Sequence, residues 1–203
     1  MSVDNELMKW YNEEKLQHIS MLLNTMKGTG MFVYQNELKT LYQEDVWEIL
    51  SASEKEFIPP LSERSFTTQQ SFSEEKDDNT GLTRYYQQML QQEFILAIDK
   101  EKVIGFLTFI PDYILKLEGK KYECDYVTTI VVSPGFRGDG IARKMYHTFF
   151  ENRRGKNFAT RTWSTNYSHI HLLKKMDFEL VALFPNDRGD GKDTVYYFRK
   201  GIE

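Results

Sequence analysis

The chain has 203 residues, of which 40% are hydrophobic, 14% aromatic and 28% charged, and its formal net charge is -4. This composition predicts a folded globular domain rather than a disordered chain, and the lack of a basic block argues against a nucleic-acid partner. The single cysteine, Cys124, excludes an internal disulfide, and we expect it in the core. No secretory signal and no apolar run of about 20 residues is recognisable, so we expect a cytoplasmic protein without a membrane partner.

The first predicted element is a helix over residues 4–26, where apolar residues recur at helical spacing before Gly28 and Gly30. We therefore expect residues 1–30 to form an N-terminal helical extension and residues 31–203 to form a single domain. The extension could be a lid on the core, a docking helix or a dimer arm. The expected state is accordingly a monomer or a homodimer.

The domain begins with a second helical pattern over residues 45–58 and continues through a polar stretch at 71–81. We interpret this stretch as a solvated loop, with an acidic flap that faces substrate as the alternative. Residues 82–92 read as a helix that leads into β-rich sequence. The predicted strands are 93–99, 103–110, 122–132, 158–165, 179–184 and 194–200, and the predicted later helices are 140–153 and 168–176. This order predicts an α/β (α+β) domain around one mixed, mostly antiparallel central sheet flanked by helices.

The tetrapeptide Arg-Gly-Asp-Gly occurs twice, at 137–140 and at 188–191. The first copy follows a strand and precedes a helix, so its glycines and the helix N-terminus would present backbone N–H groups to a phosphate. The second copy lies between two strand patterns and is surrounded by turn-forming residues. We interpret it as a hairpin loop, with a loop that overhangs a substrate pocket as the alternative.

Two common phosphate motifs are disfavoured at the first copy. A P-loop requires Gly-Lys-Ser/Thr, whereas Ile141 and Ala142 follow Gly140. A dinucleotide fingerprint requires a small residue where the chain has Arg143. The sequence also contains no Cys-x-x-Cys and no His-Glu-x-x-His motif, so no metal is expected.

The segment 137–142, preceded by the strand residues and proline of 130–134, resembles the signature of the GCN5-related N-acetyltransferase (GNAT) family. That signature is Gln or Arg, two residues, Gly, one residue, and Gly or Ala. A second family element is met by Asn166, Leu172, Met176 and Phe178. The resemblance extends from about residue 31 to the end and implies a GNAT-like fold, to which the N-terminal helix is an addition.

The resemblance implies direct transfer of an acetyl group from acetyl-CoA, as cosubstrate, to the primary amine of a small-molecule or peptide acceptor. It implies a pyrophosphate site in the backbone of 137–142 and a pantetheine site in the main chain of 130–132. Arg143 could add a charged contact, and Asn166 could bind the arm from the other side, with a helix N-cap as the alternative. The implied cofactor-binding residues are Ile130, Val131, Val132, Arg137, Gly138, Asp139, Gly140, Ile141, Ala142, Arg143 and Asn166.

The sequence departs from the family where a tyrosine usually protonates the leaving thiolate, because Leu173 occupies that position. The candidate catalytic residues are Tyr126, as a water-mediated base or positioning group, and His169, as a proton shuttle. Trp163 and Tyr167 flank the expected cleft and could shape an acceptor pocket or simply pack. Leu173 also motivates an alternative function, an acyl-CoA-binding sensor or interaction module that has lost catalysis.

Overall fold

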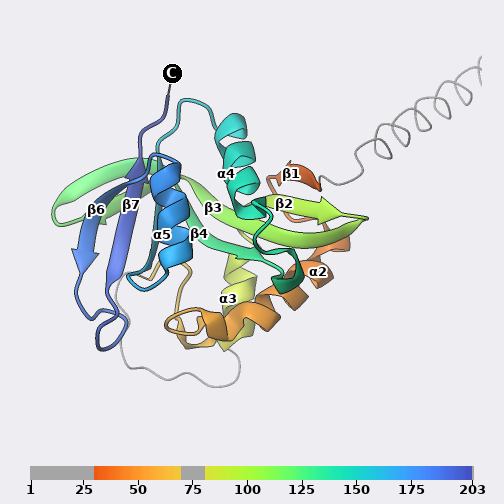
Figure 1. The fold of residues 1–203 in the computed structure, drawn as a ribbon, viewed down its shortest axis with the longest axis horizontal. Coiled ribbons are helices and arrows are strands. Elements are labelled where there is room, and N and C mark those ends of the chain that lie inside the picture. The colour runs from red at the N-terminus through yellow and green to blue at the C-terminus, as the bar shows by residue number, and fades with distance from the viewer. Residues whose placement is uncertain (1–29, 70–80, 203) are drawn as a thin grey trace, which may run out of the picture. The chain divides into compact units, whose positions relative to one another are not determined.

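The computed structural model describes residues 30–69 and 81–202. The helix expected over 4–26 lies outside these residues, as does the polar stretch 71–81 apart from its last residue. The described residues contain a seven-stranded sheet in the order β1-β2-β3-β4-β5-β7-β6 (Figure 1). Its strands are β1 (Met31–Gln35), β2 (Glu93–Asp99), β3 (Lys102–Leu117), β4 (Lys120–Val132), β5 (Phe158–Trp163), β6 (Glu179–Phe184) and β7 (Thr194–Arg199).

The sheet is mixed and mostly antiparallel, which confirms the predicted fold class. β4 and β5 pair in parallel, whereas the pairs β2–β3, β3–β4, β5–β7 and β6–β7 are antiparallel. The α-helices of the described part are α2 (Thr40–Ser53), α3 (Gly81–Met89), α4 (Ile141–Asn152) and α5 (Tyr167–Lys175). Three short 3-10 turns are η1 (Glu54–Glu56), η2 (Leu61–Glu63) and η3 (Pro134–Phe136).

The helices divide between the two faces of the sheet. α4 and α5 pack on one face through a buried cluster that contains Phe149 and Leu173, and Figure 1 shows both helices in front of the sheet. α2 and α3 pack through a second buried cluster that contains Leu50 and Met89. Alternate residues of β2 belong to these two clusters, as side chains of a strand that is covered on both faces must.

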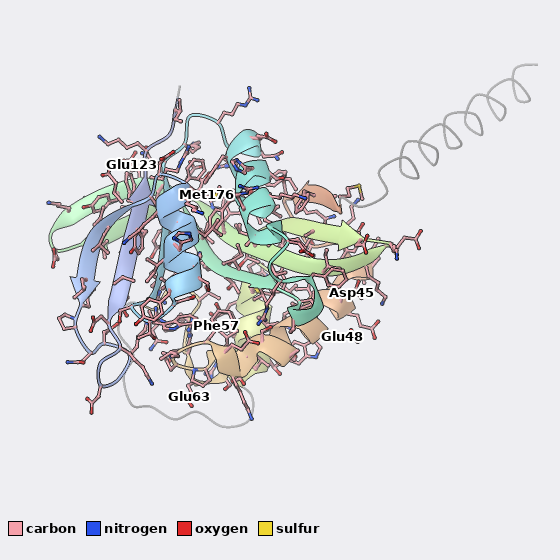
Figure 2. The ribbon with its side chains drawn as sticks, in the orientation of Figure 1. Asp45, Glu48, Phe57, Glu63, Glu123 and Met176 are labelled. Carbon is pink, nitrogen blue, oxygen red and sulfur yellow. The ribbon has the colours of Figure 1, made fainter. Side chains whose placement is uncertain are left out.

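The start of α2 differs from the sequence prediction because tertiary contacts override local pattern. α2 begins at Thr40 rather than at residue 45, and Asp45 lies inside it. The Asp45 carboxylate accepts hydrogen bonds from Val103 N at 2.9 Å and Lys102 Nζ at 3.0 Å, which fixes α2 against the β2–β3 hairpin (Figure 2). Asp45 is therefore a buried partner of the sheet within α2 rather than the first residue of the helix.

The hairpin of β3 and β4 is also longer than predicted. The sequence at 111–121 is rich in charges and contains a proline, which reads as a loop. In the structure both strands continue through this stretch with register shifts, and they turn at Glu118 and Gly119, whose φ angles are 48° and 79°. A positive φ favours glycine, so Gly119 was a sequence indication of this turn. The charged residues around it made the whole stretch look like a loop.

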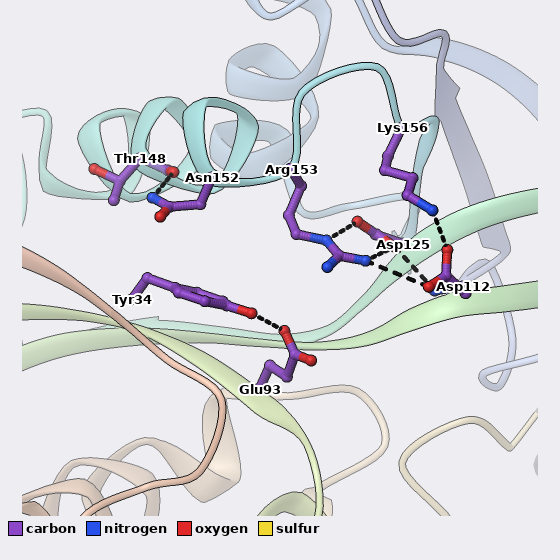
Figure 3. A network of polar contacts seen from close by, with 8 residues as sticks. All are labelled: Tyr34, Glu93, Asp112, Asp125, Thr148, Asn152, Arg153 and Lys156. Atoms are coloured by element: carbon purple, nitrogen blue, oxygen red, sulfur yellow. Dashed lines mark hydrogen bonds and ion pairs between the residues drawn. The ribbon is translucent and has the colours of Figure 1, made fainter.

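A polar network ties the start of β5 and the end of α4 to β4 (Figure 3). The Asp125 carboxylate, which is fully buried, accepts hydrogen bonds from Arg153 Nε at 2.7 Å and Nη2 at 3.1 Å, and from Asp112 N at 2.9 Å. The Asp125 N–H donates to Asn157 O at 2.8 Å. Because Arg153 follows α4 directly, the network sets that helix against the strands on which it packs.

None of the helices in residues 30–69 and 81–202 is long and apolar enough to cross a membrane.

Candidate active site

The two parallel strands β4 and β5 form a fork. They pair only where Asp125, Tyr126 and Val127 face residues 158–160. Beyond Val127, β4 remains paired with β3, and beyond Thr160, β5 remains paired with β7. The strands therefore separate in the middle of the sheet and leave two facing edges without a ladder between them.

The free edge of β4 presents backbone groups of two residues to this gap. Ser133 N donates to Ile104 O on β3 at 2.9 Å. Backbone groups alternate in direction along a strand, so Val131 also faces β3, while Ile130 and Val132 face the fork. The Val132 carbonyl at this edge accepts a hydrogen bond from Arg137 Nε at 2.8 Å.

The glycine loop after β4 leads into α4. Gly138 and Gly140 have φ angles of 94° and 74°, and a Cβ at either position would meet no atom within 4 Å. Glycine is needed here for its backbone conformation, and the space in front of both residues is open. Gly140 is the N-cap of α4 and supplies no side chain, and the helical hydrogen bonds begin with Lys144 N to Gly140 O at 3.0 Å. The first-turn N–H groups of α4 therefore have no acceptor within the helix, an arrangement that suits an anion.

The fork and the glycine loop open into one cavity of about 690 Å³. Eleven of the thirteen residues predicted for the site line it: Ile130, Val131, Val132, Arg137, Gly138, Gly140, Ile141, Ala142, Arg143, Asn166 and His169. Asp139 is exposed and does not line the cavity. Its place in the signature reflects the turn between the two glycines rather than a contact of its side chain.

Asn166 has the structure of a helix N-cap, the alternative that the sequence left open. Its Oδ1 accepts hydrogen bonds from His169 N and from Ser168 Oγ, each at 3.3 Å. Its Nδ2 donates to Thr162 Oγ1 at 3.0 Å, which ties the start of α5 to β5. Asn166 therefore orders the cavity wall, and both polar ends of its amide already have protein partners.

His169 lies in the first turn of α5 and lines the cavity. Its Nε2 is 3.0 Å from the hydroxyl of Tyr146, a buried residue of α4, and the two rings stack with centroids 6.1 Å apart. Burial lowers the pKa of His169 to about 4. The imidazole is therefore neutral at neutral pH, with Nε2 engaged by Tyr146.

Tyr126 does not line the cavity, contrary to the role predicted for it. It is 2% exposed and stacks on Tyr113, with ring centroids 5.1 Å apart. Burial raises the pKa of Tyr126, so the phenol stays protonated and cannot act as a base near neutral pH. Cys124, two residues earlier, is also buried, and burial raises the pKa of its thiol to about 12, as expected for a core cysteine.

Three arginines outside the predicted site residues line the same cavity: Arg64, Arg161 and Arg188. Arg64 and Arg188 are 5% and 7% exposed. Arg161 lies on β5 one residue beyond its last pair with β4, and Arg188 belongs to the second Arg-Gly-Asp-Gly copy. That copy is the β6–β7 hairpin loop, as predicted, and its arginine also reaches the cavity.

Aromatic and acidic side chains complete this wall. The rings of Phe57 and Trp163 lie 6.0 Å apart, and the Arg64 guanidinium lies 5.4 Å from the centroid of Phe57, which Figure 2 shows in the loop after α2. Glu56 pairs with Arg137, with Oε2 2.9 Å from Nη1. Tyr167, predicted beside the cleft, is 74% exposed and does not line the cavity.

Comparisons with known proteins agree on the fold. The family model described as the Acetyltransferase (GNAT) family matches residues 44–178. Curated proteins give no match to the sequence.

Solved structures that resemble the chain share its fold at low sequence identity. The aminoglycoside 6'-N-acetyltransferase of Enterococcus faecium aligns with a TM-score of 0.58 and 12% identity over 85% of this chain and 98% of its own. The structure of yncA from Salmonella typhimurium with its cofactor acetyl-CoA aligns with a TM-score of 0.58 and 18% identity over 85% and 95%. Arabidopsis thaliana NAA60 in complex with a bisubstrate analogue aligns with a TM-score of 0.57 and 15% identity over 84% and 98%.

Proposed function

The chain belongs to the GNAT family of acetyltransferases, and we propose that it transfers the acetyl group of acetyl-CoA directly to the primary amine of an acceptor. The chain is an acetyl-CoA-dependent acyltransferase. The primary amine as acceptor, and transfer without a covalent acetyl-protein intermediate, are the proposed parts. The observation that carries the proposal is the cavity, which joins an uncapped helix N-terminus to the free edge of a forked strand. This arrangement suits a donor with a pyrophosphate and a peptide-like arm.

The residues of the loop fit the pyrophosphate of CoA. Backbone N–H groups at the N-terminus of α4 and the positive end of its dipole favour a phosphate, and Gly138 and Gly140 leave the approach open. Arg143 is exposed in the first turn and lines the cavity, so its guanidinium can add a charge-assisted contact. The backbone groups of Ile130 and the N–H of Val132 at this edge can bind the amides of the pantetheine arm as an added strand would, while the Val132 carbonyl accepts from Arg137.

Acetyl-CoA, when bound, supplies an activated thioester, and the reaction consists of amine attack on its carbonyl and departure of the thiolate. A backbone N–H at the free edge near Val132 would stabilise the oxyanion that develops during attack. The amine must lose a proton and the thiolate benefits from gaining one. We assign His169 to this proton transfer as a neutral hydrogen-bonding group, because it lines the cavity and its Nε2 lies 3.0 Å from the Tyr146 hydroxyl.

Isothermal titration of CoA into matched variants tests the donor site. Gly140→Asp places a carboxylate at the pyrophosphate position and should abolish binding of CoA at millimolar concentration. Gly191→Asp is the control, because Gly191 occupies the same place in the second copy, has a φ of 69° against 74° for Gly140, and has equally open surroundings. Equal loss of binding in both variants, or retained binding in Gly140→Asp, would refute the site.

A screen of CoA release over a panel of amines tests the catalytic part. Turnover with an amine, without a covalent acetyl-protein intermediate, supports direct transfer. The second candidate function is an acyl-CoA-binding sensor, which Leu173 favours because its buried aliphatic side chain cannot protonate a thiolate. Tight binding of acetyl-CoA with no turnover across the panel would favour that sensor over the enzyme proposed here.

A further inference from the structure

The Tyr146 hydroxyl and the His169 ring form a contact between α4 and α5, the two helices on one face of the sheet (Figure 1). We propose that Tyr146 is a positioning residue, whose hydroxyl holds the His169 imidazole for proton exchange in the cavity. This inference rests on the proposed function and deepens the part of it that concerns the proton. Tyr146 does not itself line the cavity, so its role is exerted through His169.

His169 is fixed at both its main chain and its ring. Its N–H donates to Asn166 Oδ1 at 3.3 Å, and Asn166 Nδ2 donates in turn to Thr162 Oγ1 on β5 at 3.0 Å. Its Nε2 lies 3.0 Å from the Tyr146 hydroxyl on α4. The imidazole is therefore tied to β5, which forms one side of the fork, and to the helix that follows the glycine loop.

Tyr146 can hold the ring because its own position is fixed. It is fully buried and lies in the second turn of α4, about 8 Å along the helix axis from Ile141 at its start. The Tyr146 ring packs on Phe150 and Phe178, with ring centroids 5.9 and 5.8 Å away. A tyrosine hydroxyl that is buried among aromatic rings needs a hydrogen-bond partner, and His169 supplies one.

Both side chains are neutral near neutral pH. Burial lowers the pKa of His169 to about 4, and burial raises the pKa of Tyr146. A neutral imidazole has one ring nitrogen that donates and one that accepts, and a phenol oxygen can accept. When Nε2–H donates to the Tyr146 oxygen, Nδ1 of His169 keeps its lone pair and can take up a proton.

The proton balance of acetyl transfer suits this form of the ring. As the amine nitrogen bonds to the carbonyl carbon, one N–H bond of the amine breaks and its proton passes to Nδ1 of His169. As the C–S bond breaks, the same proton passes from Nδ1 to the thiolate sulfur, so His169 ends neutral as it began. The Tyr146 oxygen accepts from Nε2–H throughout and stabilises the charge that the ring carries between the two transfers. Leu173, one turn later on α5, is buried and has no polar side-chain atom that could replace the ring.

Tyr146→Phe removes the hydroxyl and keeps the ring that packs in the core. With an amine that the wild-type protein acetylates, we expect kcat to fall by about tenfold or more, while the KM for acetyl-CoA and the Kd for CoA change by less than about twofold. Tyr197→Phe is the matched control. Tyr197 is a buried tyrosine of the same cluster and, in the described part of the chain, makes no hydrogen bond with His169. An unchanged kcat in Tyr146→Phe, or an equal loss in Tyr197→Phe, would overturn the proposal.

A double variant separates positioning from packing. If Tyr146 acts through His169, Tyr146→Phe should lower kcat in the wild-type background but have no further effect in the background of His169→Gln. A further loss of about tenfold in the double variant would mean that Tyr146 supports activity by another route, and would contradict the proposal.

Nitrogen NMR of histidine-labelled protein observes the ring directly and does not depend on turnover. The His169 signals are identified by their absence in His169→Gln. They should show the Nε2–H tautomer in the wild type and in Tyr197→Phe, and a mixture of tautomers in Tyr146→Phe. An Nδ1–H tautomer in the wild type, or the same tautomer in all three proteins, would count against the role of Tyr146.

This inference and the proposed function fail in different ways. Turnover of an amine that Tyr146→Phe leaves unchanged would keep the acetyltransferase and overturn the role of Tyr146. Absence of CoA binding by the wild-type protein, or absence of turnover with every amine, would instead refute the proposed function. The contact between Tyr146 and His169 would then be a packing contact only, whatever tautomer the spectra show.

Discussion

Arg64 and Arg188 meet at a single atom, the carbonyl oxygen of Ile58. Arg64 Nη2 donates to this oxygen at 3.4 Å, and Arg188 Nη1 donates to it as well. Arg188 is 130 residues from Ile58 in the sequence, so the contact joins the loop after α2 to the β6–β7 hairpin. One backbone carbonyl thus holds two positive charges side by side in the wall of the cavity.

The shared carbonyl predicts that the two arginines are energetically coupled. We expect Arg64→Met and Arg188→Met to change the free energy of unfolding non-additively, by about 1 kcal/mol. The second substitution should be better tolerated in the background of the first, because the repulsion between the guanidinium groups is then gone. Urea unfolding of the wild type, both single variants and the double variant measures the coupling, and strict additivity would contradict it.

The network around Asp125 predicts a strong effect of a small substitution. Asp125→Asn should lower the free energy of unfolding by about 3 kcal/mol, because the new amide would face donors from Arg153 and from the Asp112 backbone. Asp112→Asn is the matched control. Asp112 pairs with Lys156 and, at 3.6 Å, with Arg153, but its side chain is 66% exposed, and asparagine tolerates its φ of 51°, so the cost should stay below about 1 kcal/mol. Chemical denaturation of both variants should show this difference. Similar losses of unfolding free energy in the two variants would argue against a stabilising role of the network around Asp125.

His169 predicts a pH dependence of stability. Its pKa is about 4 in the folded protein against an ordinary value of 6.5, so the unfolded chain binds the proton more readily. Stability should therefore fall as pH decreases from about 6.5 to about 4, with a slope of up to about 1.4 kcal/mol per pH unit from this group. His169→Gln should flatten the slope in that window. His147→Gln, at an exposed histidine of α4, should leave the slope unchanged, and a slope that persists in His169→Gln would disprove the assignment.

The ion pair between Glu56 and Arg137 predicts that substitution of Glu56 changes the affinity for CoA only modestly. Its ion pair with Arg137 is largely exposed, and such pairs contribute at most about 1 kcal/mol. Glu56→Gln removes a negative charge beside the loop and releases Arg137, so the Kd for CoA should decrease by no more than about fivefold. Titration at low and at high salt checks this, since the effect should shrink as salt screens it. A weaker affinity for CoA in Glu56→Gln would contradict this account.

Features that depend on one short, continuous segment were predictable from the amino-acid sequence. The glycine loop, its preceding strand and the apolar stripe of α4 lie within one continuous segment, and Gly138 and Gly140 require their type because of their φ angles. The order of the strands and helices after β1 follows from pattern in the same way, whereas β1 (Met31–Gln35) was not predicted. These local elements are sufficient to predict a pyrophosphate loop at 137–142 and to suggest the family from the amino-acid sequence alone.

Features that depend on long-range contacts were not predictable. Arg161 reads as an ordinary strand residue, and only the fork and the strand alternation direct it into the cavity. Arg188 reads as part of a turn, which it is, and nothing nearby indicates that its side chain reaches Ile58. Tyr126 was wrong as a catalytic candidate, because its side chain is buried against core residues and does not line the cavity.

The fork also sets the geometry that a tight inhibitor must satisfy. The glycine loop before α4 and the side chain of Arg161 lie toward opposite faces of one sheet, and both line the cavity, which lies where β4 and β5 separate past Val127 and Thr160. A single molecule that occupies both halves must pass a narrow linker through that opening. The length of this linker would be set by the thickness of the sheet rather than by the width of the cavity. Inhibitors with a bulky group at the linker should therefore bind in only one half of the cavity.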